Sequence, residues 1–200
     1  IVIVAGEPNS IFFEIFFKSL QSKNFNKPII LIGSLKILQL QMKKLNYRKK
    51  INLLNTKNLT NKKINNKEIN LINVEYNQKK AFEKLSKKSN TYIKTSFDLA
   101  VKLIKEGFSD KLINGPISKK NFLNKSYLGM TEYIAQKFKT KTSCMLIYNK
   151  KLSVSPLTTH LPLRAVSKKL SKNLIIEKIK LINEFYKKQL KIKPHIAILG

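Results

Sequence analysis

Runs of apolar residues alternate along this chain with stretches in which apolar residues recur every three or four positions. Two β-branched runs, at residues 1–5 and 28–32, each end at a glycine, and this pattern predicts buried strands followed by turns. The helical spacing after each run predicts a helix, and Ser10 and Ser34 stand where a hydroxyl can cap its first turn. Alternating strands and helices predict an α/β fold.

Each of the first two predicted helices has its own apolar positions. The spacing after Ser10 is carried by Ile11, Ile15 and Leu20, and the spacing after Ser34 by Leu35, Leu38, Met42 and Leu45. The phenylalanines at positions 12, 13, 16 and 17 have apolar rather than basic neighbours, so we expect them in the core.

The rest of the chain predicts further elements of both types. Residues 49–90 are rich in lysine and asparagine, and two short apolar pieces there predict short edge strands among loops. Beyond them we expect a helix at 91–107, a strand at 110–114, a helix at 131–138, a hairpin of 142–148 with 152–157, a helix at 173–190 and a strand at 196–199. A buried strand normally continues through a loop into a helix, so we expect the fold to be incomplete at the C-terminus.

The chain is strongly basic, with 40 Lys and Arg against 11 Asp and Glu, a formal net charge of +29 at pH 7. One interpretation is a polyanion binder, and the other is a lysine-rich composition with a solvated surface. The lysines are spread over the whole length, and arginine, which forks onto phosphates and bases, occurs only at Arg48 and Arg164. We therefore expect neither nucleic acid nor a membrane as a partner.

Three features of the sequence bear on cellular location. No apolar run approaches the ~20 residues that a transmembrane helix needs. No basic leader precedes an apolar region, so we expect no signal peptide. Cys144 is the single cysteine, which excludes an internal disulfide and fits a reducing compartment. We expect a cytoplasmic protein.

Four polar segments carry the candidate chemistry. They are residues 6–10 (Gly-Glu-Pro-Asn-Ser), 114–119 (Asn-Gly-Pro-Ile-Ser-Lys), 129–133 (Gly-Met-Thr-Glu-Tyr) and 158–164 (Thr-Thr-His-Leu-Pro-Leu-Arg), named here the first to fourth segments. Open α/β sheets bind ligands at the carboxyl ends of their strands. Taken singly the segments are weak signals, since Gly-Pro after a strand is usually a turn and Thr131 is most simply a helix N-cap.

The fourth segment holds one of two histidines and one of two arginines in the chain. The residues alone leave two interpretations of His160, a loop histidine bonded to a backbone carbonyl or a metal ligand. Arg164 either binds an anionic ligand or forms an ion pair that holds the fourth segment against a neighbouring carboxylate. The other histidine, His195, matches no ligand position and is interpreted as structural or surface.

The order and spacing of the segments resemble the 4-hydroxythreonine-4-phosphate dehydrogenase family of pyridoxal phosphate biosynthesis. The family's first loop is Gly-Asp-Pro and ends in a glutamate, matched here by Gly6-Glu7-Pro8 with Glu14. Its second and third signatures, Gly-Pro-Ile-Asn-Lys and Gly-His-Thr-Glu-Tyr, are each matched with one replacement. Its fourth, Thr-Thr-His-Leu-Pro-Leu-Arg, is matched at every position. The resemblance covers the whole chain.

The resemblance implies a three-layer α/β/α fold of the isopropylmalate dehydrogenase-like type, with a first domain at residues 1–125 and the start of a second at 126–200. It implies a homodimer with the site near the subunit interface. It also implies an NAD-dependent enzyme that oxidises the secondary alcohol of 4-phosphohydroxy-L-threonine. The resulting β-keto acid then loses carbon dioxide to give 3-amino-2-oxopropyl phosphate.

The resemblance further implies a divalent metal ion (Zn, Mg or Co) held by three histidines, of which His160 matches the first. Such an ion would polarise the oxygen that becomes a carbonyl, and neutral imidazole suits it. The family motif with the other two histidines would begin just beyond Gly200, so we expect these 200 residues to lack a complete site. Thr131 matches a substrate-binding threonine.

Two departures from the family pattern keep other functions open. Met130 replaces the histidine that precedes this threonine, and a thioether cannot donate a hydrogen bond. Residues 11–13, Ile-Phe-Phe, replace the glycine-rich start of the family's first helix, which argues against close approach of a ligand there. One alternative is a related dehydrogenase acting on a phosphorylated sugar acid, such as threonate or erythronate phosphate. The other is a noncatalytic basic binding protein.

Overall fold

The computed structural model describes residues 1–56, 59, 64–123, 127, 129–140, 142–159 and 161–199. The chain divides into two compact units, Ile1–Ser126 and Tyr127–Gly200, each of which is described by itself. Among the described residues, none of the helices combines the length and the apolar character that crossing a membrane requires.

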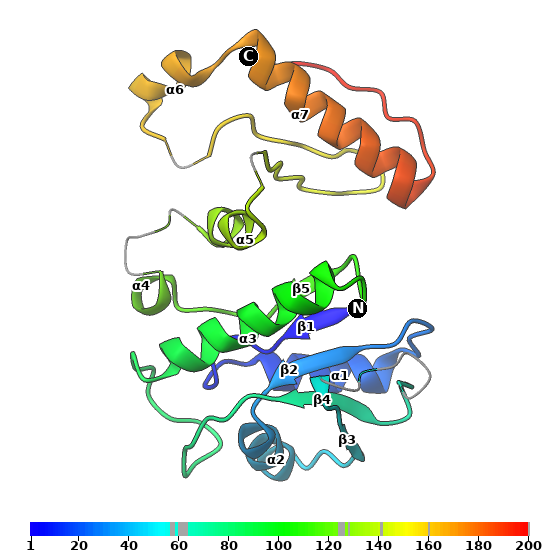
Figure 1. The fold of residues 1–200 in the computed structure, drawn as a ribbon, viewed down its shortest axis with the longest axis vertical. Coiled ribbons are helices and arrows are strands. Elements are labelled where there is room, and N and C mark those ends of the chain that lie inside the picture. Colours follow the sequence, from blue (N-terminus) through cyan, green and yellow to red (C-terminus); the bar gives the residue numbers. More distant parts are fainter. Residues whose placement is uncertain are drawn as a thin grey trace. The chain divides into compact units, whose positions relative to one another are not determined.

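The first unit is a parallel sheet with intervening helices (Figure 1). Its elements are β1 (Val2–Val4), α1 (Phe12–Ser22), β2 (Ile30–Gly33), α2 (Leu35–Lys44), β3 (Ile51–Leu53), β4 (Ile69–Asn73), α3 (Ser89–Lys105), β5 (Leu112–Asn114) and α4 (Lys119–Phe122). The strands pair in parallel in the order β3-β4-β2-β1-β5. The prediction of edge strands in residues 49–90 is therefore right for β3 and wrong for β4, which lies inside the sheet.

Helices cover both faces of this sheet, which gives the unit three layers (Figure 1). Alternate residues of a strand point to opposite faces. Ile3, Leu31 and Leu71 are paired in register and share one buried cluster with side chains of α1 and α2. On the opposite face α3 packs against β1 and β2. The predicted α/β fold is confirmed.

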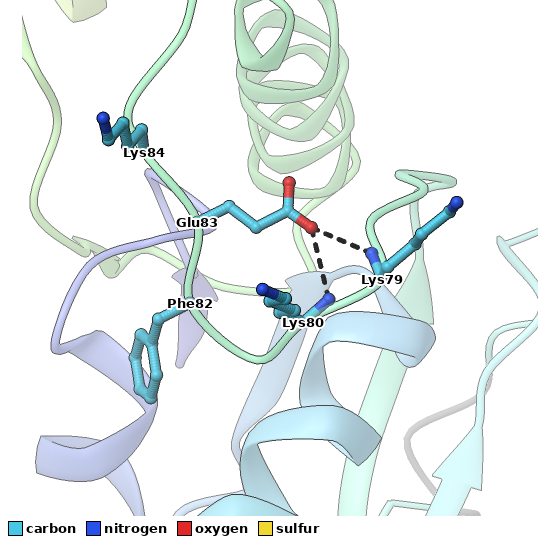
Figure 2. A pocket seen from close by; sticks show the side chains of 5 residues that line it. All are labelled: Lys79, Lys80, Phe82, Glu83 and Lys84. Carbon is cyan, nitrogen blue, oxygen red and sulfur yellow. Dashed lines mark hydrogen bonds between the residues drawn. The ribbon is translucent and has the colours of Figure 1, made fainter.

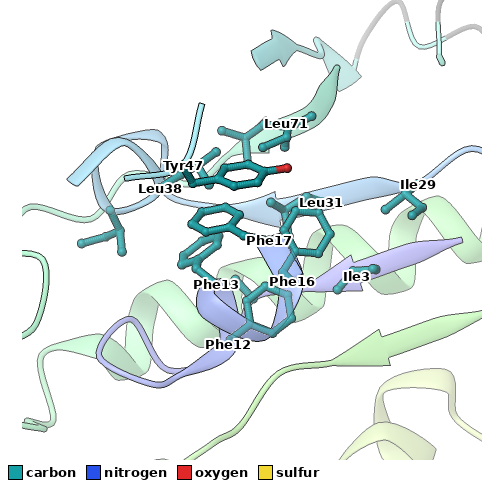
Figure 3. Packing of buried hydrophobic residues seen from close by; sticks show 13 residues of the cluster. Ile3, Phe12, Phe13, Phe16, Phe17, Ile29, Leu31, Leu38, Tyr47 and Leu71 are labelled. Carbon is teal, nitrogen blue, oxygen red and sulfur yellow. The ribbon is translucent and has the colours of Figure 1, made fainter. Parts of the chain in front are cut away.

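The four phenylalanines of α1 form the centre of that cluster, as predicted (Figure 3). The Phe17 ring stacks on Tyr47 with a centroid distance of 4.3 Å. By contrast, Ile11 and Ile15 are 60% and 51% exposed, so the prediction that they form the apolar side of this helix is wrong. Rings bury more apolar area than isoleucine side chains, and they therefore decide which face turns to the sheet.

The second unit is mainly helical in its described residues. It contains α5 (Met130–Phe138), α6 (Leu163–Lys169), α7 (Lys172–Phe185) and a π-helical turn η3 (Tyr186–Leu190). The predicted hairpin is reduced to one antiparallel bridge, in which Ile147 and Val154 exchange backbone hydrogen bonds of 2.8 and 3.0 Å. Residues 196–199 form no strand, contrary to prediction, because no described segment pairs with their backbone.

Candidate functional site

The first and second segments meet at the point where the strand order reverses. From β1 the chain moves to β2 on one side and later returns to β5 on the other side of β1. The Glu7 N–H donates to the Pro116 carbonyl at 2.8 Å, and the Gly115 N–H donates to the Val4 carbonyl at 2.8 Å. Sheets of this type bind ligands outside the carboxyl ends of the strands at such a reversal.

Two glycines allow these segments to approach so closely. A Cβ on Gly115 would lie 2.1 Å from the carbonyl oxygen of Ala5, a backbone atom that has little freedom to move. Gly6 has a φ of +78°, and a Cβ there would lie 2.6 Å from the carbonyl oxygen of Pro116. The contact between the two segments therefore depends on glycine at both positions.

Glu7 is a buried carboxylate at this junction, with only 4% of its surface exposed. Its Oε1 accepts a hydrogen bond from the Ser89 hydroxyl at 2.6 Å. Ser89 is the first residue of α3, so the carboxylate lies at the positive end of a 17-residue helix. Oε2 is also buried and has no hydrogen-bond partner among the described residues.

Two tyrosines share the surroundings of Glu7. Burial raises the pKa of the Tyr92 phenol, and the negative charge of Glu7 adds to that rise. The pKa of Tyr76 is also raised, first by burial and then by the charge of Glu7. The Tyr92 hydroxyl accepts from the Ser34 N–H at 3.2 Å, which links this cluster to the carboxyl end of β2. Both phenols therefore ionise only at a pH above the ordinary tyrosine pKa of 10.0.

A lysine-rich loop lies beside the first segment. The Gln41 amide donates to the carbonyls of Pro8 and Ala81 at 2.9 and 3.1 Å, and the Glu83 N–H donates to Asn9 Oδ1 at 2.9 Å. These bonds fasten the loop to the first segment and to α2. The loop surrounds an open hollow of about 550 Å³ lined by Lys79, Lys80, Phe82, Glu83 and Lys84.

The side chains around this hollow do not converge on one point (Figure 2). Lys79 and Lys84 extend away from each other. Glu83 Oε1 instead accepts from the backbone N–H groups of Lys79 and Lys80 at 2.9 and 3.2 Å, and these bonds lower the pKa of the Glu83 carboxyl. The carboxylate therefore organises the loop backbone, and the lysines form a solvated surface rather than a cradle for one anion.

Thr131 of the third segment is the second residue of α5, and the cap position is Gly129. The interpretation of Thr131 as an N-cap is therefore wrong. Its side chain lines a largely apolar hollow of about 480 Å³ with Ile134, Ala135, Phe138, Thr140 and Ser143. The predicted role of Thr131 in substrate binding stays a prediction.

The third and fourth segments are joined by a side-chain contact. The Thr159 hydroxyl donates to Glu132 Oε1 at 3.3 Å. Glu132 Oε2 is buried and has no hydrogen-bond partner among the described residues. This contact has no local signal in the sequence, because the two residues are 27 positions apart.

His160, the predicted metal ligand, lies outside the described residues. Within the described part of the chain, no three His, Cys, Asp or Glu side chains are grouped so that they could hold a metal ion. His195 is exposed and follows Pro194 in an irregular stretch. Arg164 is exposed in the first turn of α6, and Lys119 is exposed at the start of α4. The predicted metal site at His160 therefore stays a prediction.

The fold of the first unit and the junction of the first and second segments define an α/β protein with polar loops where parallel sheets bind small molecules. The model of one family, described as pyridoxal phosphate biosynthetic protein PdxA, matches residues 24–200. The chain belongs to this family, and the expectation from the four segments is confirmed.

Individual relatives agree with this assignment. The chain is 34% identical over 215 residues to a 4-hydroxythreonine-4-phosphate dehydrogenase of Sulfurihydrogenibium sp. (strain YO3AOP1), covering 100% of this chain and 62% of that protein. It is 39% identical over 74 residues to the protein of the same name from Aquifex aeolicus, covering 37% of this chain and 23% of that protein. The chain therefore spans about three fifths of the length of the relative that it matches end to end.

Solved structures support the same fold. The 4-hydroxythreonine-4-phosphate dehydrogenase of Burkholderia phymatum superposes with a TM-score of 0.78 at 21% identity, covering 94% of this chain and 58% of that chain. The enzyme of the same name from Klebsiella pneumoniae gives a TM-score of 0.76 at 23% identity, covering 93% and 58%. At these identities the likeness establishes the α/β architecture.

Proposed function

We propose that this chain serves the NAD-dependent oxidation and decarboxylation of 4-phosphohydroxy-L-threonine to 3-amino-2-oxopropyl phosphate in pyridoxal 5′-phosphate biosynthesis. The observation that carries the proposal is the match of residues 24–200 to the PdxA family. It is supported by relatives that bear the name 4-hydroxythreonine-4-phosphate dehydrogenase. The fully matched fourth segment supports the same assignment.

The proposed reaction has two steps. The carbon that bears the secondary alcohol transfers a hydride to NAD, the hydroxyl releases its proton, and a carbonyl forms. The carboxylate β to this carbonyl then leaves as carbon dioxide, and its bonding electrons pass into an enolate that takes up a proton. Within this scheme we assign a substrate-binding role to Thr131, whose hydroxyl can donate or accept one hydrogen bond.

We further propose NAD and a divalent metal ion (Zn, Mg or Co) as cofactors, with His160 as one metal ligand. The described residues do not supply the rest of a metal centre, so no step is derived through the ion. We also propose a cytoplasmic homodimer with its site near the subunit interface, acting on a small phosphorylated substrate without nucleic acid or membrane partners.

A second candidate activity is favoured by one residue. Met130 is the first residue of α5, directly before Thr131, and its thioether cannot donate a hydrogen bond to a substrate. A site that lacks this donor suits a substrate with a different polar group at that point. The alternative is therefore a dehydrogenase for a phosphorylated sugar acid such as threonate or erythronate phosphate.

The deciding experiment measures NADH formation by the protein as its gene encodes it. NAD, each divalent ion and either 4-phosphohydroxy-L-threonine or a sugar-acid phosphate are supplied in parallel. We expect turnover of 4-phosphohydroxy-L-threonine. Turnover of only the sugar-acid phosphate would replace the first proposal by the second. Absence of any turnover, together with salt-sensitive binding to duplex DNA and no metal content, would favour a basic binding protein instead.

A further inference from the structure

Glu132 lies where two segments of the candidate site meet within the second unit. It is the third residue of α5, directly after Thr131. Its Oε1 accepts the hydroxyl of Thr159, which is 27 residues away in the sequence. The contact therefore ties the first turn of α5 to the fourth segment.

The other carboxylate oxygen has an unusual environment. Glu132 Oε2 is buried and finds no hydrogen-bond partner among the described residues. A buried carboxylate oxygen is costly unless donors surround it. Because both oxygens share one carbon, Oε2 also lies beside Thr159.

We propose that Glu132 is a positioning residue that holds the fourth segment against the first turn of α5. Glu132 contacts this segment through the hydroxyl of Thr159, and the next residue in the sequence is His160. The link thus acts on the segment that carries the proposed metal ligand without Glu132 being a catalytic residue.

A double-mutant cycle in the 200-residue chain tests the link. Glu132→Ala and Thr159→Val each remove one partner, and urea unfolding gives the unfolding constant of each variant. Each single variant should raise the equilibrium constant of unfolding by some factor. We expect the constant of the double variant to be about fivefold lower than multiplication of these two factors predicts, because both single variants lose the same interaction. Additive effects would overturn the proposal. Thr159→Ser keeps the hydroxyl and should restore the wild-type value.

A second measurement separates positioning from general stability. The chain contains two histidines, so isotope-labelled histidine gives one ring signal for His160 and one for His195. We expect Glu132→Ala and Thr159→Val to shift the His160 signal, Thr159→Ser to return it, and the His195 signal to stay in place. Unchanged signals, or equal shifts of both, would overturn a positioning role.

The matched control is Glu184→Ala. Glu184 is an exposed glutamate of α7 that pairs with Lys188 at 3.2 Å, and its removal should leave both ring signals unchanged. Neither measurement requires substrate or NAD, and the link rests on the proposed function only for its meaning in catalysis. A failure of the proposed activity therefore leaves this test intact.

Discussion

Replacing Glu7 tests the physical account of the junction between the first and second segments. Glu7→Ala removes a charge-assisted hydrogen bond of 2.6 Å to the Ser89 hydroxyl and a negative charge at the start of α3. The bond contributes about 1.5–3 kcal/mol and the helix terminus about 0.3–1 kcal/mol. The substitution also relieves the burial of Oε2, which costs about 1–3 kcal/mol.

These opposing contributions leave a net loss. Ser89 keeps a second acceptor, the Ser86 carbonyl at 3.0 Å, so its hydroxyl is not left without a partner. At the midpoints of these ranges, we expect Glu7→Ala to lower the free energy of unfolding by about 1 kcal/mol, and Glu7→Gln by less because it keeps Oε1 as an acceptor.

The assay is urea unfolding followed by circular dichroism, with the denaturant slope compared between variants. The control is Glu14→Ala, because Glu14 pairs with Lys18 on the exposed side of α1 and should contribute only about 0.3–0.5 kcal/mol. The Glu14 effect should fade in high salt, whereas the buried Glu7 effect should persist. A Glu7→Ala chain as stable as wild type would refute the reasoning, since burial of Oε2 would then cancel the whole contribution.

Four further expectations follow from the same structure. Gly115→Ala should cost several kcal/mol in thermal unfolding, because its Cβ would lie 2.1 Å from a backbone oxygen, whereas Gly107→Ala, with open space around it, should cost about 1 kcal/mol from its φ of +80°. Phe17→Ala should lower the free energy of unfolding by about 3–5 kcal/mol in urea, against less than about 0.5 kcal/mol for the exposed Ile15→Ala. The raised pKa of Tyr92 means that this phenol ionises at a lower pH in the unfolded chain than in the folded chain. The stability linked to the protonated phenol is therefore present below the ordinary pKa of 10.0 and is lost as pH rises above it. Unfolding curves of Tyr92→Phe should lack this part of the alkaline loss. Elemental analysis of the 200-residue chain should find little tightly bound divalent metal, and a stoichiometric ion would contradict this.

The order of elements in the first unit could be predicted because each signal is local. A β-branched run that ends at glycine and a serine before a helical repeat both act within a few residues, and Ser34 does accept the Ile37 N–H at 3.4 Å. The face of α1 could not be predicted in this way. Ile11 and Ile15 have the same four-residue spacing as Phe12 and Phe16, and only packing against the sheet distinguishes the two rows.

Strand pairing was predicted less well because it depends on partners that are distant in the sequence. β4, which contains Asn70, lies in the lysine- and asparagine-rich residues 49–90, whose composition predicted edge strands. Asn70 is nevertheless only 2% exposed, and its amide donates to the carbonyls of Ile29 and Asn65 at 3.1 and 2.7 Å. The apolar residues 196–199 show the opposite case, since β propensity without a neighbouring strand forms no sheet.

The four segments, which the sequence presents as separate loops, are joined in two pairs. The first and second are held together by the Glu7–Pro116 backbone bond, and the third and fourth by the Glu132–Thr159 bond. Each pair lies within one unit of the chain. In each pair a glutamate lies at a helix N-terminus and bonds one serine or threonine hydroxyl, and its second carboxylate oxygen is buried without a hydrogen-bond partner among the described residues. The same arrangement thus recurs in both units: a carboxylate fixes a polar segment to the start of a helix, and burial of its second oxygen opposes part of that stabilisation.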